Sequence, residues 1–356
     1  MAAAGAILHP GYIRSPRADL VWFLALPFVA VAIALGFHHL LPYMAQVSIA
    51  VWVTIPHHYA TWIRSYGMQE DWSRWKDRLV LGPCLLIASV LLGSAFTPVT
   101  LALVLLLWDH QHSMMQQHGF ARIYDFKAGT GSPSLRRLDL WLGLVLYGNL
   151  LVTAPLWSEL WIAELYRWDL QVGADVILRI QSASWTATGA FLALYLLHMG
   201  AGLARGDRIN PVKYLFLAAS YGLWYFVSWQ DSFIVYTVAH RIMHGVQYIA
   251  FVYWYLGRKA ETTGRRPRLL SRFNLWRFLL LAAVYAVVFQ LAVGSGLADF
   301  SFGLVQALQQ DEYLRFSAEK ATGFYAATAV SAAAAVHYYV DSFIWKVSDS
   351  NTQQGL

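Results

Sequence analysis

Long apolar stretches recur along this chain at the length that a membrane-spanning helix requires. A helix crosses the hydrocarbon core of a bilayer with about 20 apolar residues, and about ten stretches qualify. They lie at roughly residues 19–40, 44–63, 79–96, 98–119, 138–157, 181–203, 212–229, 231–256, 275–297 and 322–346. Since lipid offers no hydrogen-bond partners to an open backbone, each stretch is expected to span as an α-helix. The predicted fold class is an all-α, polytopic integral-membrane helical bundle of about ten transmembrane helices.

Composition supports a membrane protein of one domain. The 356 residues are 58% hydrophobic and 13% charged, whereas a soluble domain is about 45–50% apolar and about 25% charged. No linker or change of composition divides residues 1–356, so a single transmembrane domain is predicted. The one cysteine, Cys84, excludes an internal disulfide. The net charge of +6 is interpreted through membrane topology, and no nucleic-acid partner is expected.

The distribution of Lys and Arg predicts the orientation of the chain. With the N-terminus inside, the outer loops hold Arg167, Arg179, Arg315 and Lys320, and Arg241 lies within a stretch. The remaining 21 of the 26 basic residues fall on the inner side, which is a strong positive-inside asymmetry. We expect a multi-pass protein of the inner (cytoplasmic) membrane with both termini cytoplasmic and no cleavable signal peptide.

Histidine recurs in the second, fourth, sixth, eighth and tenth stretches, which all run from outside to inside in this topology. A charged side chain at the centre of a membrane helix costs at least about 2.5–3.5 kcal/mol, so ionisable groups at similar depth suggest one shared site. Most of these histidines lie roughly 10–21 Å from the basic inner ends at a rise of 1.5 Å per residue. Because neutral imidazole is the commonest protein metal ligand, a common metal site is predicted toward the cytoplasmic side.

The pair His240 and His244 is the clearest ligand candidate in the sequence. Its i, i+4 spacing places both side chains on one helix face, and Gln247 continues that face. His-x3-His is a familiar way to present two imidazoles to one metal. The alternative is that both are packed histidines bonded to neighbouring carbonyls.

His337 and Asp341 repeat the same spacing with a carboxylate. Asp341 is interpreted as a metal ligand or as the acceptor that orients an imidazole. The alternative is an ion pair between Asp341 and either Lys346 or Arg241, with Asp109 as the other partner expected for Arg241. The run of small residues at 331–336 permits close helix approach or leaves room for a long apolar substrate.

The fourth stretch holds the densest polar cluster. His110 and His118 lie on about one helix face and are candidate ligands, whereas His112 is expected to point elsewhere. In the second stretch, Pro56 loosens the helix just before His57 and His58. Adjacent histidines point about 100° apart on a helix, so one of the two is expected to bind metal, and His57 is preferred.

Three other histidines are assigned to packing or to the membrane interface. His198 stands alone in its stretch, and a lone histidine is more often a packing residue. His38 and His39 lie at the outer end of the first stretch, on the wrong side for the predicted site. The metal ligands expected from the sequence are therefore His57, His110, His118, His240, His244, His337 and Asp341.

The pair His240/His244, with His57 and His110 on other stretches, resembles two groups of histidine-rich membrane iron oxygenases. The Brp/Blh-type beta-carotene dioxygenases are similar because they are wholly helical and carry histidines on several spans. Membrane fatty-acid desaturases and hydroxylases carry HxxxH and HxxHH boxes. The segment HRIMH matches the first box, but this sequence has no HxxHH. The resemblance is confined to short motifs and general architecture. It implies non-haem iron, dioxygen and a lipophilic substrate.

These observations favour an enzyme, a membrane-bound oxygenase, hydroxylase or desaturase. One or two non-haem iron ions would be its cofactor, and a lipophilic small molecule, membrane lipids and an electron donor its partners. Haem held by two histidines, in a haem or quinone electron-transfer protein, is the less favoured cofactor. A proton- or metal-coupled transporter is the third alternative. No motif for nucleotide binding or serine hydrolysis is present, and no catalytic residue is assigned.

Overall fold

The computed structural model describes residues 7–230, 232–268, 274–293 and 320–356, and every regular element in these ranges is a helix. The elements are α1 (Pro16–Asp19), the π-helix η1 (Leu20–Ala25), α2 (Leu26–Leu40), α3 (Tyr43–Ser65), α4 (Gln69–Phe96), α5 (Pro98–Ala128), α6 (Pro133–Thr153), α7 (Pro155–Arg167), α8 (Ala174–Ala204), α9 (Pro211–Ser228), α10 (Phe233–Thr263), α11 (Leu275–Val293), α15 (Lys320–Ile344) and α16 (Ser350–Gln353). The all-α prediction is confirmed for this part of the chain.

Each of the predicted apolar stretches coincides with a helix or a continuous run of helices over its described residues. The end of the stretch 275–297 and the predicted outer loop around Arg315 lie outside the described residues. Helix starts follow local chemistry: Ser132 and Asn210 accept hydrogen bonds from Leu135 N and Val212 N, and a proline follows each cap. Helix α7 begins inside the predicted stretch 138–157 and continues into the outer loop that follows it, where no helix was predicted.

Three helical segments are long and apolar enough to cross a membrane: Pro16–Leu40, Gln69–Phe96 and Ala174–Ala204. A fourth candidate is the pair α6 and α7, which is bent by 66° at Ala154. The apolar segment Leu275–Leu291 of α11 is shorter than these. It and the other predicted spans are treated below as part of the proposed function. The described residues thus form an all-helical protein with three or four candidate membrane spans.

The chain divides into two compact units, which are described separately. The first contains residues 7–29 and 113–236, and the second contains residues 30–112 and 237–356. Helices α2, α5 and α10 each contain residues of both units. The single domain expected over residues 1–356 stays a prediction.

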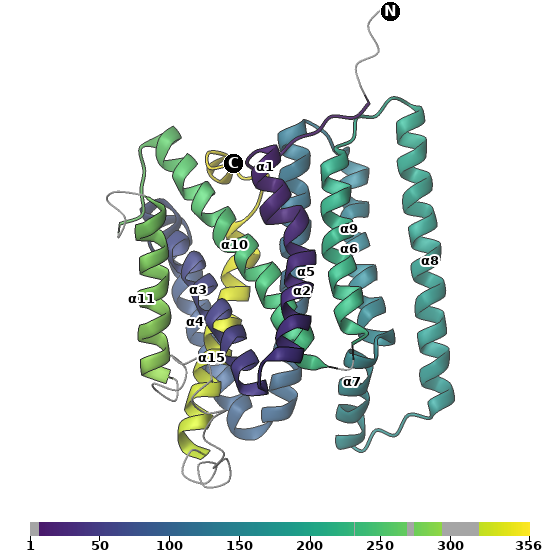
Figure 1. Cartoon of the computed structure of the whole chain (residues 1–356), viewed down its shortest axis with the longest axis vertical. Coiled ribbons are helices and arrows are strands. Elements are labelled where there is room, and N and C mark those ends of the chain that lie inside the picture. The colour runs from purple at the N-terminus through teal and green to yellow at the C-terminus, as the bar shows by residue number, and fades with distance from the viewer. Residues whose placement is uncertain (1–6, 231, 269–273, 294–319) are drawn as a thin grey trace, which may run out of the picture. The chain divides into compact units, whose positions relative to one another are not determined.

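In the first unit, α6 packs against α8 and α9 (Figure 1). Its interior also contains a buried charged cluster at the ends of α5, α6 and α9. The Lys213 Nζ, fully buried, lies 3.2 Å from Asp125 Oδ2 and 2.9 Å from Asp139 Oδ2. Arg122 Nη1 lies 2.7 Å from the same Asp125 oxygen and 3.3 Å from that of Asp139. Two cations thus balance two carboxylates.

Replacing Lys213 by methionine is expected to destabilise the protein by about 3–5 kcal/mol, because buried carboxylates lose a cation that neutralises them. Arg208→Met removes an exposed charge from the neighbouring loop and is the matched control, with an expected change below about 1 kcal/mol. Unfolding in detergent, followed by circular dichroism, measures both. Equal stability of the two variants would show that the cluster does not hold the unit together.

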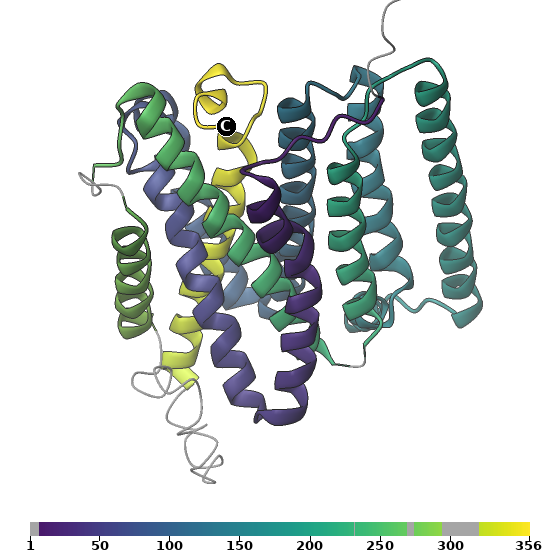
Figure 2. The ribbon, with the colours of Figure 1, turned by 45° about the horizontal axis from the view of Figure 1, so that its top comes forward.

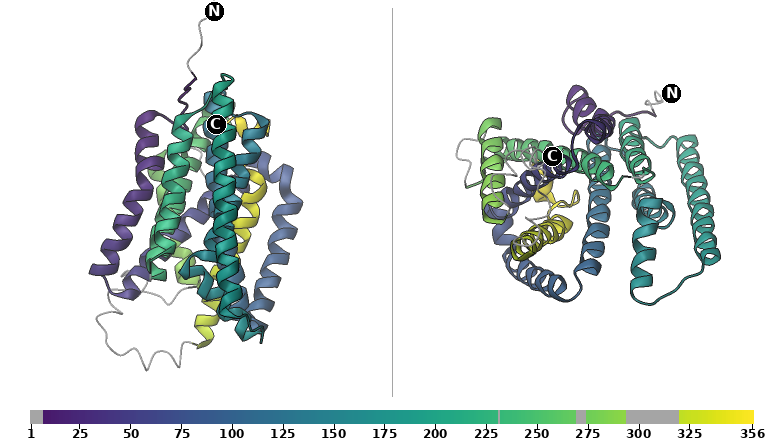
Figure 3. Two further views of the ribbon diagram at one scale, coloured as in Figure 1. Left: turned by 90° about the vertical axis from the view of Figure 1, so that its right-hand side faces the viewer. Right: turned by 60° about the horizontal axis from the view of Figure 1, so that its bottom comes forward.

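In the second unit, α3 packs against α4, α11 and α15, and α15 also packs against α4 and α11 (Figure 3). The small residues of 331–336 are used for close helix approach. Ala332 and Ala335 pack in one buried cluster with Val90 of α4, and Leu101 and Trp108 of α5 lie against it. Of the two uses predicted for this run, helix packing is the one that the described side chains show.

Helices α3, α10 and α15 run in the same direction and end together (Figures 1 and 2). Arg64 near the end of α3 donates from Nη2 to the Ile344 carbonyl at the end of α15, at 2.5 Å. Lys259 near the end of α10 forms an ion pair with Glu70 at the start of α4. The three helices that carry the strongest ligand candidates therefore share one polar, charged end.

Candidate metal centre

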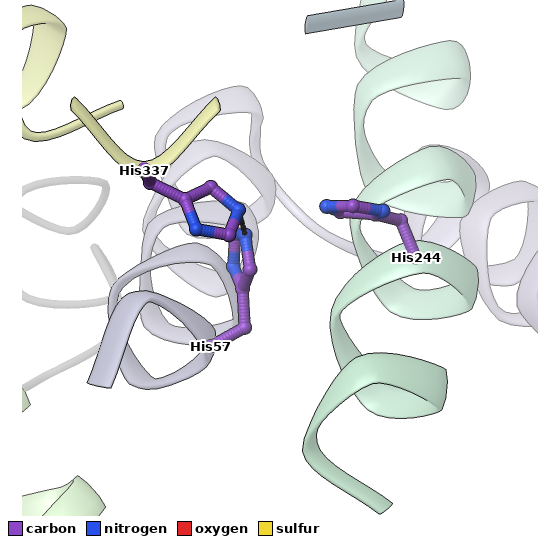
Figure 4. A group of neighbouring side chains, drawn as sticks. All are labelled: His57, His244 and His337. Atoms are coloured by element: carbon purple, nitrogen blue, oxygen red, sulfur yellow. Dashed lines mark hydrogen bonds between the residues drawn. The ribbon is translucent and has the colours of Figure 1, made fainter. Parts of the chain in front are cut away.

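Three imidazoles converge inside the second unit, one from each of α3, α10 and α15. His57, His244 and His337 are fully buried, and one ring nitrogen of each lies within 4.8 Å of the others (Figure 4). His57 Nε2 and His337 Nε2 are 3.1 Å apart. Two nitrogens bound about 2.0–2.1 Å from one metal lie about 3 Å apart when they subtend a right angle. This spacing is therefore suited to two ligands of a single ion.

Gly245 is where α10 comes close to α3. A Cβ built on this glycine would lie 3.3 Å from Val53 Cγ1 and 3.6 Å from His57 Cβ. The first distance is tighter than ordinary packing, so the Val53 side chain would have to shift by a few tenths of an ångström to admit any larger residue. Gly245 directly follows His244 in the sequence. The close approach that it permits brings the His57 and His244 rings to a centroid separation of 5.0 Å.

A second group of candidate ligands shares His337 with the first. His112, His337 and Asp341 are all buried, and their donor atoms also lie within 4.8 Å of one another. Asp341 Oδ2 is 3.9 Å from His112 Nε2 and 3.8 Å from His337 Nδ1. The expectation that His112 points away from the site is wrong. The spacing within α5 did not reveal it, because the helices that face His112 come from distant parts of the sequence.

The other oxygen of Asp341 accepts hydrogen bonds from two side chains. Thr61 Oγ1 donates to Asp341 Oδ1 at 2.9 Å, and the Tyr248 hydroxyl donates to the same oxygen at 2.8 Å. Thr61 Oγ1 also lies 2.7 Å from His337 Nδ1, and Trp345 Nε1 donates to the Tyr248 oxygen at 3.0 Å. Sequence reasoning missed Thr61 and Tyr248, since an isolated threonine or tyrosine in a membrane helix looks like an ordinary packing residue.

His240 lies beside this group and faces a different carboxylate. Its Nε2 is 3.6 Å from Asp109 Oδ2. Asp109 also pairs with Arg241, at 2.7 Å, and accepts a hydrogen bond from the Tyr338 hydroxyl at 2.8 Å. Of the two partners predicted for Arg241, Asp109 is confirmed. Because Arg241 neutralises Asp109, this carboxylate is better suited to orient His240 than to bind a second cation.

His58 has a buried imidazole ring whose nitrogens form no hydrogen bonds with the described residues. The side chain is buried, and within the described part of the chain neither of its ring nitrogens has a hydrogen-bond partner. Its ring centroid lies 4.9 Å from that of His337. Buried polar groups almost always have a partner, so these nitrogens are available to a ligand. The preference for His57 agrees with the three-histidine group, and the structure adds His58 at its edge.

The remaining predicted ligands are placed farther from these groups. The His110 ring lies 6.1 Å from that of His240, between centroids, and His110 is in neither three-residue group. His118 belongs to the first compact unit and is also in neither group. His198 accepts from or donates to Ser134 at 3.2 Å, as a residue with a structural partner does. The assignment of His110 and His118 as ligands, like that of the whole set, stays a prediction, and His198 was predicted only as a packing residue.

At the charged end of the second unit, where α3, α10 and α15 end, Arg64 packs against aromatic side chains. The Arg64 guanidinium lies 3.6 Å from the centre of the Trp345 ring and 4.5 Å from that of Tyr255. In the C-terminal tail, Thr352 Oγ1 accepts a hydrogen bond from Arg64, and the Asn351 amide donates one to Asp71.

Asp349 in the same tail forms an ion pair with Arg74. Partial burial acts to raise the pKa of Asp349, but hydrogen bonding from Arg74 outweighs it and holds this pKa below its usual value.

No protein-family model, curated protein or solved structure matches this chain.

Proposed function

We propose that the protein is a membrane-bound, metal-dependent oxidoreductase whose metal is bound by His57, His244 and His337. The convergence of these three buried imidazoles from three helices is the observation that supports the proposal best. Imidazole suits zinc, copper, iron and nickel. Iron is proposed because a site held by histidine, with a carboxylate at Asp341, matches non-haem iron centres that keep positions open for dioxygen.

Non-haem iron is preferred to haem because of how the imidazoles pack. The centroids of the His57, His58, His112 and His337 rings lie 4.6–4.9 Å apart in the pairs 57–58, 57–337, 58–337 and 112–337. Rings in mutual contact leave no room for a porphyrin between two axial ligands. A single ion, or two closely spaced ions, fits the same space.

The proposed substrate is a lipophilic small molecule, such as a lipid, carotenoid or hydrocarbon. A substrate of this kind is supplied by the membrane itself, and dioxygen also reaches a buried apolar site. The oxidation would act on C–H or C=C bonds, and for hydroxylation or desaturation an external electron donor would supply the remaining electrons. The proposal requires an open metal position and a dry surrounding, and the burial of His57, His244, His337 and Asp341 supports the second requirement.

The proposed topology has ten spans, with both termini on the cytoplasmic side of the inner membrane. The common direction of α3, α10 and α15 supports it, as do the basic residues Arg64 and Lys259 at the end that they share. Reporter fusions after residue 170 should therefore read outside, and fusions after residue 265 should read inside. An inside signal at residue 170 would contradict the ten-span arrangement and the orientation together.

Nitric oxide binding to the Fe(II)-loaded protein tests the proposed chemistry. An open position on non-haem iron should bind nitric oxide and give a new high-spin electron paramagnetic resonance signal. With a reductant supplied as the electron donor, the same preparation should consume dioxygen faster when lipid extracts are added than without them. An Fe(II)-loaded protein with neither the signal nor dioxygen uptake would show that the centre is not an oxidase or oxygenase site.

A proton-coupled transporter is the second candidate function, since Asp341 and its hydroxyl partners Thr61 and Tyr248 lie within the helical bundle of the second unit.

A further inference from the structure

The strongest unexplained feature of the candidate site is the hydroxyl of Thr61, which lies between a carboxylate and an imidazole. Thr61 Oγ1 is 2.9 Å from Asp341 Oδ1 and 2.7 Å from His337 Nδ1. Both distances fall in the range of good hydrogen bonds. Asp341 and His337 do not reach each other directly, because Asp341 Oδ2 and His337 Nδ1 are 3.8 Å apart. Thr61 therefore bridges two groups that are too far apart to form a direct hydrogen bond.

The direction of each hydrogen bond follows from the proton count. An ionised carboxylate accepts only, and a threonine hydroxyl has a single proton to donate. Tyr248 donates to Asp341 Oδ1. The Thr61 Oγ1 also lies 2.8 Å from the Tyr248 oxygen, but it donates its own proton to Asp341 Oδ1, because a charged carboxylate is a stronger acceptor than a neutral hydroxyl. The Thr61 oxygen can then interact with His337 Nδ1 only as an acceptor. With the protons assigned in this way, His337 carries its own proton on Nδ1.

We infer that Thr61 is a positioning residue that fixes the Nδ1–H tautomer of His337 and thereby presents the Nε2 lone pair to the metal. His337 Nε2 is the atom that lies 3.1 Å from His57 Nε2. A metal-binding histidine commonly donates its other N–H to a carboxylate or carbonyl, and that bond sets the tautomer and the ring orientation. Here the carboxylate of Asp341 acts through an intervening hydroxyl. This inference rests on the metal centre proposed above.

Both ring nitrogens of His337 have a hydrogen-bonding contact, with Thr61 and with His57. Among the described side chains, His57 Nδ1 has no hydrogen-bond partner, and neither does any ring nitrogen of His58. Tyr248 links this group of hydrogen bonds to Trp345 near the charged end of the unit. His337 is thus an imidazole whose Nδ1 a neighbouring side chain holds before a metal arrives.

Three threonine variants test the inference. Thr61→Val keeps the shape of the side chain and removes the hydroxyl, so metal affinity should fall roughly 10–100-fold. Thr61→Ser keeps the hydroxyl and should retain the affinity of the natural protein. Thr54→Val is the matched control, because Thr54 lies on the same helix, is buried, and donates only to the Ala50 carbonyl. It should leave the affinity unchanged.

Nitrogen NMR of histidine-labelled protein without metal gives a readout that does not depend on metal binding. His337, identified by loss of its signals in His337→Gln, should be protonated at Nδ1 in the natural protein and lose this preference in Thr61→Val. A His337 protonated at Nε2 in the natural protein would overturn the inference, as would full metal affinity in Thr61→Val. If no variant binds metal but the Nδ1–H tautomer depends on Thr61, the metal proposal fails while the positioning role stands.

Discussion

Replacing His337 by alanine should abolish stoichiometric metal binding. His337 is the residue common to both groups of candidate ligands, so its loss removes a donor from each arrangement that the site allows. The variant also loses the ring that lies against His57, His58 and His112. Metal analysis of the purified variant in detergent, after loading with iron, measures the effect.

His39→Ala is the matched control for this loss. His39 is an exposed histidine at the end of α2, and its removal should leave both metal content and activity unchanged. Full metal retention in His337→Ala would exclude the proposed ligand set. An equal loss of metal in His39→Ala would show that metal binds adventitiously to surface histidines.

Replacing Asp341 by asparagine should weaken metal binding by roughly 10–100-fold, even if the carboxylate acts only through its neighbours. The amide keeps an oxygen that Thr61 and Tyr248 can bond to, but it removes the negative charge opposite His112 and His337. The loss is therefore expected to be smaller than in His337→Ala. Competition titration with a chelator of known affinity measures the change.

The same variant separates an enzyme from a transporter. In the oxidoreductase, Asp341→Asn weakens metal binding and lowers substrate oxidation in parallel. In a transporter, the variant would keep its full metal content but block proton-coupled flux across reconstituted vesicles. That outcome would replace the proposed function with the second candidate.

Helix positions were predictable from sequence because the apolar stretches are long, and an apolar stretch of about 20 residues is typical of a membrane-spanning helix. The positions of α3, α5, α9 and α10 followed from hydropathy despite their polar side chains. Helix α7 was missed, since its Glu159, Glu164 and Arg167 made the segment look like an interfacial loop. Pro155 directly follows the bend at Ala154. A proline disfavours the helical conformation of the residue before it, which is a local signal that hydropathy does not use.

The candidate site was predictable only in part. The pair His240/His244 was found by its spacing, but it splits in the structure: His244 faces His57, and His240 faces Asp109. Helical spacing shows which side chains share a face, but not where another helix crosses that face. For the same reason His112 was excluded and Thr61 was not considered, because both meet His337 across more than 200 residues of sequence.

Metal content of the natural protein is the measurement that tests the central claim most directly. The chain is purified in detergent without added metal or affinity tags containing histidine, and its metals and visible spectrum are determined together. We expect a first-row metal, most simply iron, at one or two ions per chain and no Soret band. A Soret band would point to haem in place of the proposed centre. A protein with neither stoichiometric metal nor haem, and unable to take up iron, would contradict the account.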